Sequence, residues 1–238
     1  MSDLTPAFSA DRLWIGLVQW LILLFALSVH EAAHAWVAER FGDSTGRALG
    51  RATLNPLPHL DLFGSLILPL ILLLMGAPLF GWARPVPMVA RNLKRPKDQL
   101  LVIAAGPLAN LLLCLVAASA CGVLVHLLGP AAKPSAAAAF QAGFLASQQV
   151  AGLPYFPLIF TLVQLACLSG SLAVFHLLPL LPLDGGRLLY TVMPADWAPK
   201  YARTQRFGLT IAMALGVFKV VWLLALPIFL FVAVLTQS

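Results

Sequence analysis

Five long apolar runs, separated by short polar loops, dominate this chain of 238 residues. A helix needs about 20 apolar residues to cross the hydrocarbon core of a bilayer. The runs cover residues 12–38, 62–80, 98–128, 155–178 and 207–235. Only 10% of the residues are charged, whereas soluble domains have about 25%. We therefore predict an all-α polytopic membrane protein with about five to six membrane segments, folded as a single integral-membrane domain over residues 1–238.

Two segments between these runs leave alternatives open. Residues 42–61 are polar and glycine-rich, which predicts a short interfacial β-hairpin or a loop. Residues 62–80 have Pro69 in their middle and either dip into the membrane and return, lie at the interface, or span it. If they span, the alanine-rich segment 136–150 must also cross. The acidic N-terminus does not resemble a secretory signal.

Basic residues gather in three loops, and this predicts a topology. The positive-inside rule places such loops on the cytoplasmic side of a cell membrane. The net charge of +6 favours contact with anionic lipid head groups over nucleic acid. The basic residues of the three loops are Arg40, Arg47 and Arg51; Arg84, Arg91, Lys94, Arg95 and Lys97; and Arg187, Lys200, Arg203 and Arg206.

The stretch SVHEAAHAW, near the end of the first apolar run, has the strongest chemical signal. His30 and His34 are four residues apart, so on a helix their imidazoles point the same way and can share one ion. Imidazole nitrogen suits zinc, and Glu31 has the spacing of a general base in a zinc hydrolase. The pattern predicts one Zn²⁺ per chain. The alternative is three polar side chains turned toward solvent at a helix end.

A hydrolytic zinc site has three protein ligands and an open position for water, so a third ligand is required. Asp184 stands out among the few acids because it follows a full apolar run in the stretch PLLPLDGG. The prolines there prevent regular helix, and Gly185 with Gly186 lets the backbone turn tightly beside an ion. Asp184 is the predicted third ligand, and a helix cap at the interface is the alternative.

Other polar and sulfur-bearing residues have structural interpretations. His59 and Asp61 are predicted to stabilise their loop or lie at the interface, with a second polar cluster near the site as the alternative. Asn110 is expected to bond to neighbouring backbone in the core. Cysteines inside apolar runs are expected to be packing residues; they are Cys114, Cys121 and Cys167.

HEAAH in a membrane helix, followed far downstream by LDGG, resembles the site-2 protease family of intramembrane zinc metalloproteases. Three further stretches agree: NPLPHLDLFGS, GWARPVP and AGPLAN. The resemblance implies that His30, His34 and Asp184 bind zinc and that Glu31 is the base. It also implies cleavage of a transmembrane segment of a membrane-protein substrate, by a compact member without the PDZ or CBS domains of some relatives.

One position departs from the family pattern. The family has an asparagine eight residues before the metal-binding aspartate, and this chain has His176 there, in FHLLP. The resemblance gives that asparagine a role in stabilising the developing oxyanion or in holding the substrate. A histidine can donate a similar hydrogen bond, so a catalytic role for His176 is one hypothesis. An inert packing residue and a competitor for the metal are the others.

Substrate binding poses a separate requirement, because a peptide bond inside a helix is shielded and unpaired backbone in lipid is costly. Residues 46–55 are predicted to form an edge strand that pairs with the unwound substrate. Two other functions remain open: a catalytically silent membrane scaffold and a metal transporter. A transporter requires polar residues staged through several spans, whereas here they gather at one depth.

Overall fold

The computed structural model describes residues 10–75, 77, 79–142, 153, 155–217, 226, 230, 231, 233 and 234. Every regular element within these residues is a helix, which confirms the predicted all-α class. The elements are α1 (Ala10–Arg40), α2 (Thr45–Ala48), η2 (Leu57–His59), η3 (Leu62–Ile67), α3 (Leu68–Met75), η4 (Ala90–Asn92), α4 (Asp98–Leu128), η5 (Gly129–Ala132), α5 (Lys133–Ala142), α6 (Phe156–His176), α7 (Asp184–Val192), α8 (Ala198–Ala202) and α9 (Gln205–Val217).

Three helices in the described part of the chain are long and apolar enough to cross a membrane: α1, α4 and α6. Each coincides with a predicted run to within a few residues. The 21 residues of α6 rise about 32 Å, close to the roughly 30 Å of the hydrocarbon core. The last predicted span, 207–235, begins within α9, and most of its second half lies outside the described residues.

The second apolar run forms one short helix, made of η3 and α3 (Leu62–Met75). Its six and eight residues rise at most about 21 Å, which is too short to cross the hydrocarbon core. Asp61 starts the helix, because its carboxylate accepts hydrogen bonds from the N–H groups of Phe63 and Gly64. These dimensions favour a segment that dips into the membrane or lies at its interface.

The β-hairpin prediction for residues 42–61 is wrong, and the loop alternative is right. Thr45–Ala48 forms one helical turn, and Leu57–His59 forms a 3₁₀ turn. Asp43 accepts a hydrogen bond from the Thr45 N–H, and Asn55 accepts one from the Leu57 N–H. Such bonds from a side chain to the backbone two residues on favour turns over strands.

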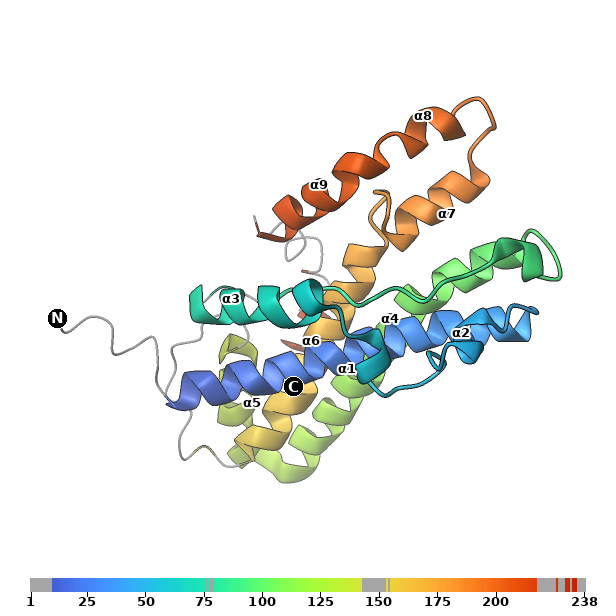
Figure 1. Ribbon diagram of the computed structural model, residues 1–238. Helices are drawn as coiled ribbons and strands as arrows, with labels where there is room; N and C mark the ends of the chain where they lie inside the picture. The colour runs from blue at the N-terminus through green and yellow to red at the C-terminus, as the bar shows by residue number, and fades with distance from the viewer. Residues whose placement is uncertain are drawn as a thin grey trace.

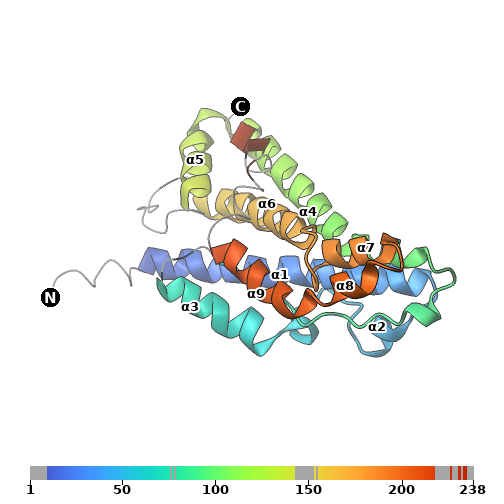
Figure 2. The ribbon, with the colours of Figure 1, turned by 90° about the horizontal axis from the view of Figure 1, so that it is seen from above.

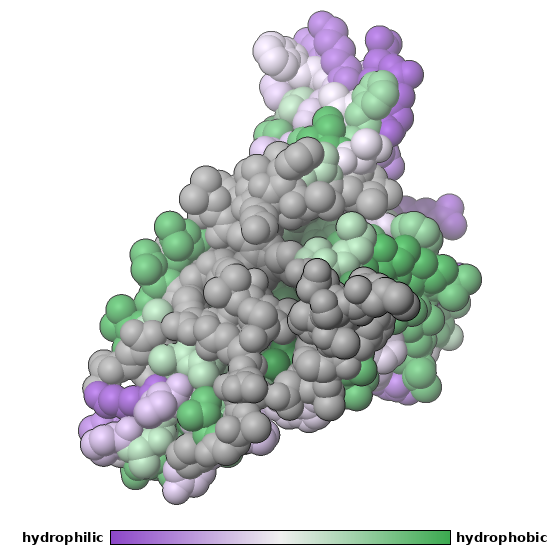
Figure 3. Space-filling model, turned by 90° about the vertical axis from the view of Figure 1, so that its left-hand side faces the viewer, coloured by the Kyte–Doolittle hydropathy of each residue, from purple (hydrophilic) through white to green (hydrophobic). Residues whose placement is uncertain are grey.

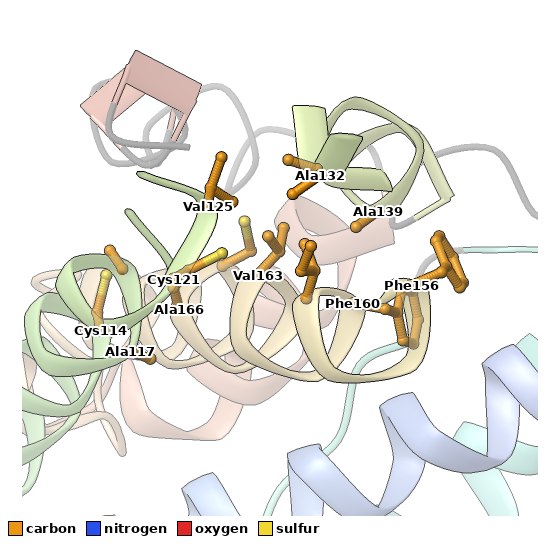
Figure 4. Packing of buried hydrophobic residues seen from close by; sticks show 14 of the residues in the cluster. Cys114, Ala117, Cys121, Val125, Ala132, Ala139, Phe156, Phe160, Val163 and Ala166 are labelled. Carbon is orange, nitrogen blue, oxygen red and sulfur yellow. The ribbon is translucent and has the colours of Figure 1, made fainter. Parts of the chain in front are cut away.

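Helix α1 lies centrally, with α3 on one side and α4 and α6 on the other (Figures 1 and 2). The largest buried apolar cluster lies where α4, α5 and α6 meet (Figure 4). Within it the rings of Phe156 and Phe160 stack with centroids 5.4 Å apart. All three cysteines lie in this cluster, buried and free, which confirms their interpretation as packing residues.

The outer faces of the long helices are apolar rather than polar. Figure 3 shows hydrophobic side chains over both flanks of the molecule, with hydrophilic ones gathered at the top of the view and in smaller groups at the lower left and the right edge. Exposed apolar surface on this scale is unfavourable in water and expected in lipid. The exposed apolar residues of α4 alone include Leu101, Leu108, Leu112, Leu115, Val116, Val123 and Leu127.

Residues 81–89, here called the anchored segment, connect the second apolar run to α4 in an extended conformation. Its N–H groups on alternate residues donate to the protein: Trp82 to the Gly64 carbonyl, and Arg84 to the His59 carbonyl. Val86 continues the alternation by donating to the Glu31 carboxylate. The predicted edge strand at residues 46–55 is wrong, because Thr45–Ala48 forms the helical turn α2 and residues 49–55 form no strand.

Asp43 holds the far end of the anchored segment and gives a pH-dependent prediction. Burial alone raises the pKa of this carboxyl, but hydrogen bonds from Thr45, Val89 and Asn92 outweigh it and hold the pKa below the ordinary 3.8. A lowered pKa stabilises the fold above pH 3.8, and this stabilisation is lost as the pH falls through the folded-state value. Thermal unfolding in detergent should therefore lose more stability on acidification in wild type than in Asp43→Asn. The same loss of thermal stability on acidification in wild type and in Asp43→Asn would contradict this account.

Candidate metal centre

Three ligand atoms from α1 and α7 converge at one point. His30 Nε2 lies 3.0 Å from Asp184 Oδ2, His34 Nε2 lies 3.3 Å from the same oxygen, and the two Nε2 atoms are 3.2 Å apart. All three residues are buried. Two stretches separated by about 150 residues thus meet on the same side of the fold, as the sequence predicts.

The spacing of these atoms fits a tetrahedral ion. Ligands bound to zinc at 2.0–2.1 Å lie about 3.3 Å from one another on the edges of a tetrahedron. The three observed separations of 3.0, 3.2 and 3.3 Å match that edge. Two imidazoles and one carboxylate are also a ligand set that suits zinc and leaves the fourth position open to water.

The ring of His34 is oriented for metal binding through Nε2. Its Nδ1 lies 2.7 Å from the carbonyl oxygen of Val102 in α4. A carbonyl only accepts, so Nδ1 carries the proton and Nε2 of the neutral ring has a free lone pair. A backbone carbonyl on the outer nitrogen is a common partner of metal-binding histidine.

Asn110, on α4, orients the second imidazole in a way the sequence interpretation did not anticipate. Its side-chain amide lies 3.2 Å from His30 Nδ1, whereas backbone contacts were expected. Its buried Oδ1 has no hydrogen-bond partner when Nδ2 faces the ring. Turning the amide over lets Oδ1 accept from His30 Nδ1–H, which leaves Nε2 of the neutral ring free for the metal.

Asn110→Ala should weaken zinc binding by about 10- to 100-fold, the usual effect of removing an outer partner of a metal-binding histidine. Asn110→Asp should retain tight binding, because a carboxylate accepts the same Nδ1–H bond. Zinc affinity of the purified variants, measured by competition with a chromophoric chelator, tests this. Equal affinity of Asn110→Ala and wild type would show that Asn110 does not orient His30.

Asp184 is the first residue of α7, and its surroundings hold it toward the imidazoles. Oδ2 faces the imidazoles, while Oδ1 lies 3.4 Å from Arg187 Nη1, one helical turn on. Gly185 and Gly186 have ordinary backbone conformations, so the expected tight turn is not their role. A Cβ on either would collide with the backbone of residues 177–181. These glycines let α7 pack closely on the preceding loop.

His176, the last residue of α6, lies against the same carboxylate. Its Nδ1 is 3.1 Å from Asp184 Oδ2, and its ring centroid is 4.1 Å from that of His30. The ligand atoms of His30, His34 and Asp184 all lie within 4.8 Å of one another, and His176 is not part of this group. This geometry makes His176 a neighbour of the ligand Asp184 rather than a fourth corner of the tetrahedron.

Gly106, on α4, lies directly against the imidazoles of the metal centre. A Cβ at this position would lie 2.6 Å from His30 Nε2 and closer still to His34 Nε2. Both imidazole nitrogens therefore lie close to the bare backbone of α4. Glycine in a helix costs about 1 kcal/mol relative to alanine, so its presence here is explained by the space that the centre needs.

Comparison with known proteins agrees with this arrangement. Residues 19–219 match the model of Peptidase family M50, and this range contains both stretches of the metal centre. The chain belongs to peptidase family M50. The resemblance to site-2 proteases found in the sequence is thereby confirmed for most of the chain.

Two curated relatives have related sequences. "Putative zinc metalloprotease YwhC" of Bacillus subtilis (strain 168) is 35% identical over 206 residues, which cover 85% of this chain and 82% of that protein. "Putative zinc metalloprotease Rip2" of Mycolicibacterium smegmatis is 33% identical over 93 residues, covering 39% of this chain and 35% of that protein. No solved structure matches the chain.

Within this M50 chain, His59 and Asp61 have the predicted loop role. His59 Nε2 donates to the Thr53 carbonyl at 3.0 Å, and Asp61 caps η3. Sequence interpretation missed Arg187 and Val86 as neighbours of the centre. Arg187 has a local signal, because a residue three positions after Asp184 on a helix lies on the same face. Val86 has no comparable signal.

Proposed function

We propose that this M50 chain is a zinc metallopeptidase that hydrolyses a peptide bond within or near a transmembrane segment of a membrane-protein substrate. The observation that supports it best is the convergence of His30, His34 and Asp184 beside the glutamate of the HEAAH stretch. All of these residues are buried in a molecule whose helices α1 and α4 expose many apolar side chains. The basic loops favour a plasma-membrane protein with the centre toward the cytoplasm.

The residues of the centre would hold one zinc ion through His30 Nε2, His34 Nε2 and Asp184 Oδ2. When bound, zinc lowers the pKa of a coordinated water to about 7 and polarises a carbonyl. Glu31 accepts the proton of the attacking water at its carboxylate and returns it to the leaving nitrogen of the peptide. General acid–base catalysis of this kind contributes about 10²- to 10⁴-fold to the rate.

The anchored segment offers a place for the unwound substrate. In an extended chain the N–H and C=O groups of alternate residues point to opposite sides. On the other side of the segment, the described residues provide no hydrogen-bond partner for the Ala83 N–H and C=O or for the Pro87 C=O. Pro87 is exposed, whereas Ala83 is buried. A substrate backbone can pair there, as strands add to exposed edges elsewhere, which satisfies its polar groups at membrane depth.

We assign His176 the role of positioning Asp184. Its Nδ1 faces a carboxylate oxygen at 3.1 Å, so Nδ1 carries the donated proton. The opposite nitrogen of a neutral ring then accepts hydrogen bonds rather than donating them. This arrangement favours an outer partner of the metal ligand over a direct donor to an oxyanion.

Metal removal tests the proposed function directly. Purified protein in detergent should cut a transmembrane peptide substrate, lose this activity on treatment with 1,10-phenanthroline, and regain it when Zn²⁺ is restored. The reason is that zinc would lower the pKa of the water from which Glu31 takes the proton. Cleavage that resists complete zinc removal would contradict the proposal.

The other two functions predict different results in the same preparation. A silent scaffold would bind zinc and cut no peptide in a panel of transmembrane sequences. A metal transporter would carry zinc into liposomes, and its flux would continue in Glu31→Gln because transport needs no general base. Either result would replace the protease proposal.

A further inference from the structure

The catalytic glutamate is held by a backbone group far away in the sequence. The N–H of Val86 donates to Oε2 of Glu31 at 2.7 Å, and both residues are buried. In the part of the chain that the structure describes, the Glu31 side chain has no other hydrogen bond. One oxygen of the general base is therefore fixed by the anchored segment, and the other is left without a protein partner.

The local sequence makes this N–H distinctive. Val86 lies between Pro85 and Pro87, which have no backbone N–H to donate. The Arg84 N–H, the next donor back along the segment, is already bonded to the His59 carbonyl. The donor that reaches Glu31 is thus fixed between two residues with restricted φ, in a backbone with little freedom to move it away.

Contacts on both sides of Val86 keep the donor in place. The Pro85 carbonyl accepts a hydrogen bond from Arg51 Nη1 at 2.7 Å. The Val86 side chain lies against Gly46. A Cβ added to Gly46 would be only 3.0 Å from Val86 Cγ1 and 3.0 Å from the Cβ of Ala35 on α1. Val86 thus packs against Gly46 of α2, which packs in turn against Ala35 of α1.

We infer that the backbone N–H of Val86 is a positioning group for the general base. Resting on the proposed function, it fixes Glu31 Oε2, so that Oε1 is presented to the attacking water in one orientation. An N–H bond to a carboxylate is among the stronger hydrogen bonds in proteins. The substrate backbone would pair with the other side of the same segment. The anchored segment would therefore position both the scissile bond and Glu31.

A pair of substitutions at residue 86 separates the N–H from the side chain. Val86→Pro removes the N–H and suits an extended chain that already has proline on both sides, whereas Val86→Ala keeps the N–H and trims the side chain. Val86→Pro should lower kcat about tenfold, since a small misplacement of a catalytic group has effects of this order. KM and zinc content should stay within about twofold of wild type, because this N–H contacts neither substrate nor metal. Val86→Ala should lose less kcat than Val86→Pro, because it keeps the N–H.

A second variant keeps the test decisive if proline disturbs folding. Valine α-hydroxy acid at position 86 replaces only the N–H by oxygen, and it should give the same loss of kcat. Wild-type kcat in the hydroxy-acid protein would overturn the inference, as would an equal loss in Val86→Ala and Val86→Pro. These results differ from a failure of the proposed function, in which wild type itself cuts no transmembrane peptide.

Discussion

Purified Glu31→Gln protein will bind one zinc ion per chain and cut a transmembrane peptide at least about 10³-fold more slowly than wild type, since it lacks the general base. Glutamine has nearly the shape of glutamate, and its side-chain oxygen can still accept from the Val86 N–H. The fold and the three ligands should therefore be unchanged. Zinc content by atomic absorption and single-turnover cleavage measure the two halves of this prediction.

The chain offers a matched control, because it has only two glutamates. Glu39 lies on the same helix two turns on, is not part of the metal centre, and forms an exposed ion pair with Arg47. Glu39→Gln should keep wild-type activity. Substantial cleavage by Glu31→Gln would require another base and would remove Glu31 from the mechanism.

Gly106→Ala will abolish high-affinity zinc binding, and with it proteolysis, while the protein remains folded. The added methyl would lie 2.6 Å from His30 Nε2, inside van der Waals contact, so the imidazoles must turn away from the point where they converge with Asp184. Alanine is a better helix former than glycine, so α4 itself should not be weakened. Zinc stoichiometry and circular dichroism on the same sample distinguish loss of metal from loss of fold.

Leu108→Ala is a suitable control for Gly106→Ala, because Leu108 lies on the same helix and is 59% exposed. This control should retain zinc and activity. Gly106→Ala protein with a full equivalent of zinc and wild-type cleavage would mean that Gly106 does not lie against the imidazole nitrogens in the working enzyme.

The membrane helices and most of the metal centre could be predicted from the sequence, because their signals are local. Helix length depends on an unbroken apolar run, and the bounds of α4 equal the predicted residues 98–128. The spacing of His30 and His34 places them on one face whatever the rest of the fold does. Asp184 is predicted from two other observations. A zinc site needs a third protein ligand, and the stretch PLLPLDGG interrupts the helix pattern.

What the sequence did not predict depends on contacts between elements. The Val86 N–H reaches Glu31 across 55 residues, and a backbone group has no residue type that could reveal its role. The contact of Asn110 with His30 could not be predicted, because nothing in AGPLAN indicates which helix Asn110 faces. The glycines at residues 42–61 left a hairpin and a loop open, and the loop is right because the side chains of Asp43 and Asn55 bond to the backbone of the turns that follow them.

The most direct test of the account is X-ray absorption at the zinc edge on the purified, enzymatically active protein. It predicts one zinc per chain, with two imidazole nitrogens and one carboxylate oxygen at about 2.0–2.2 Å, and loss of the carboxylate contribution in Asp184→Ala. A spectrum with sulfur ligands at about 2.3 Å, or one unchanged in Asp184→Ala, would contradict it.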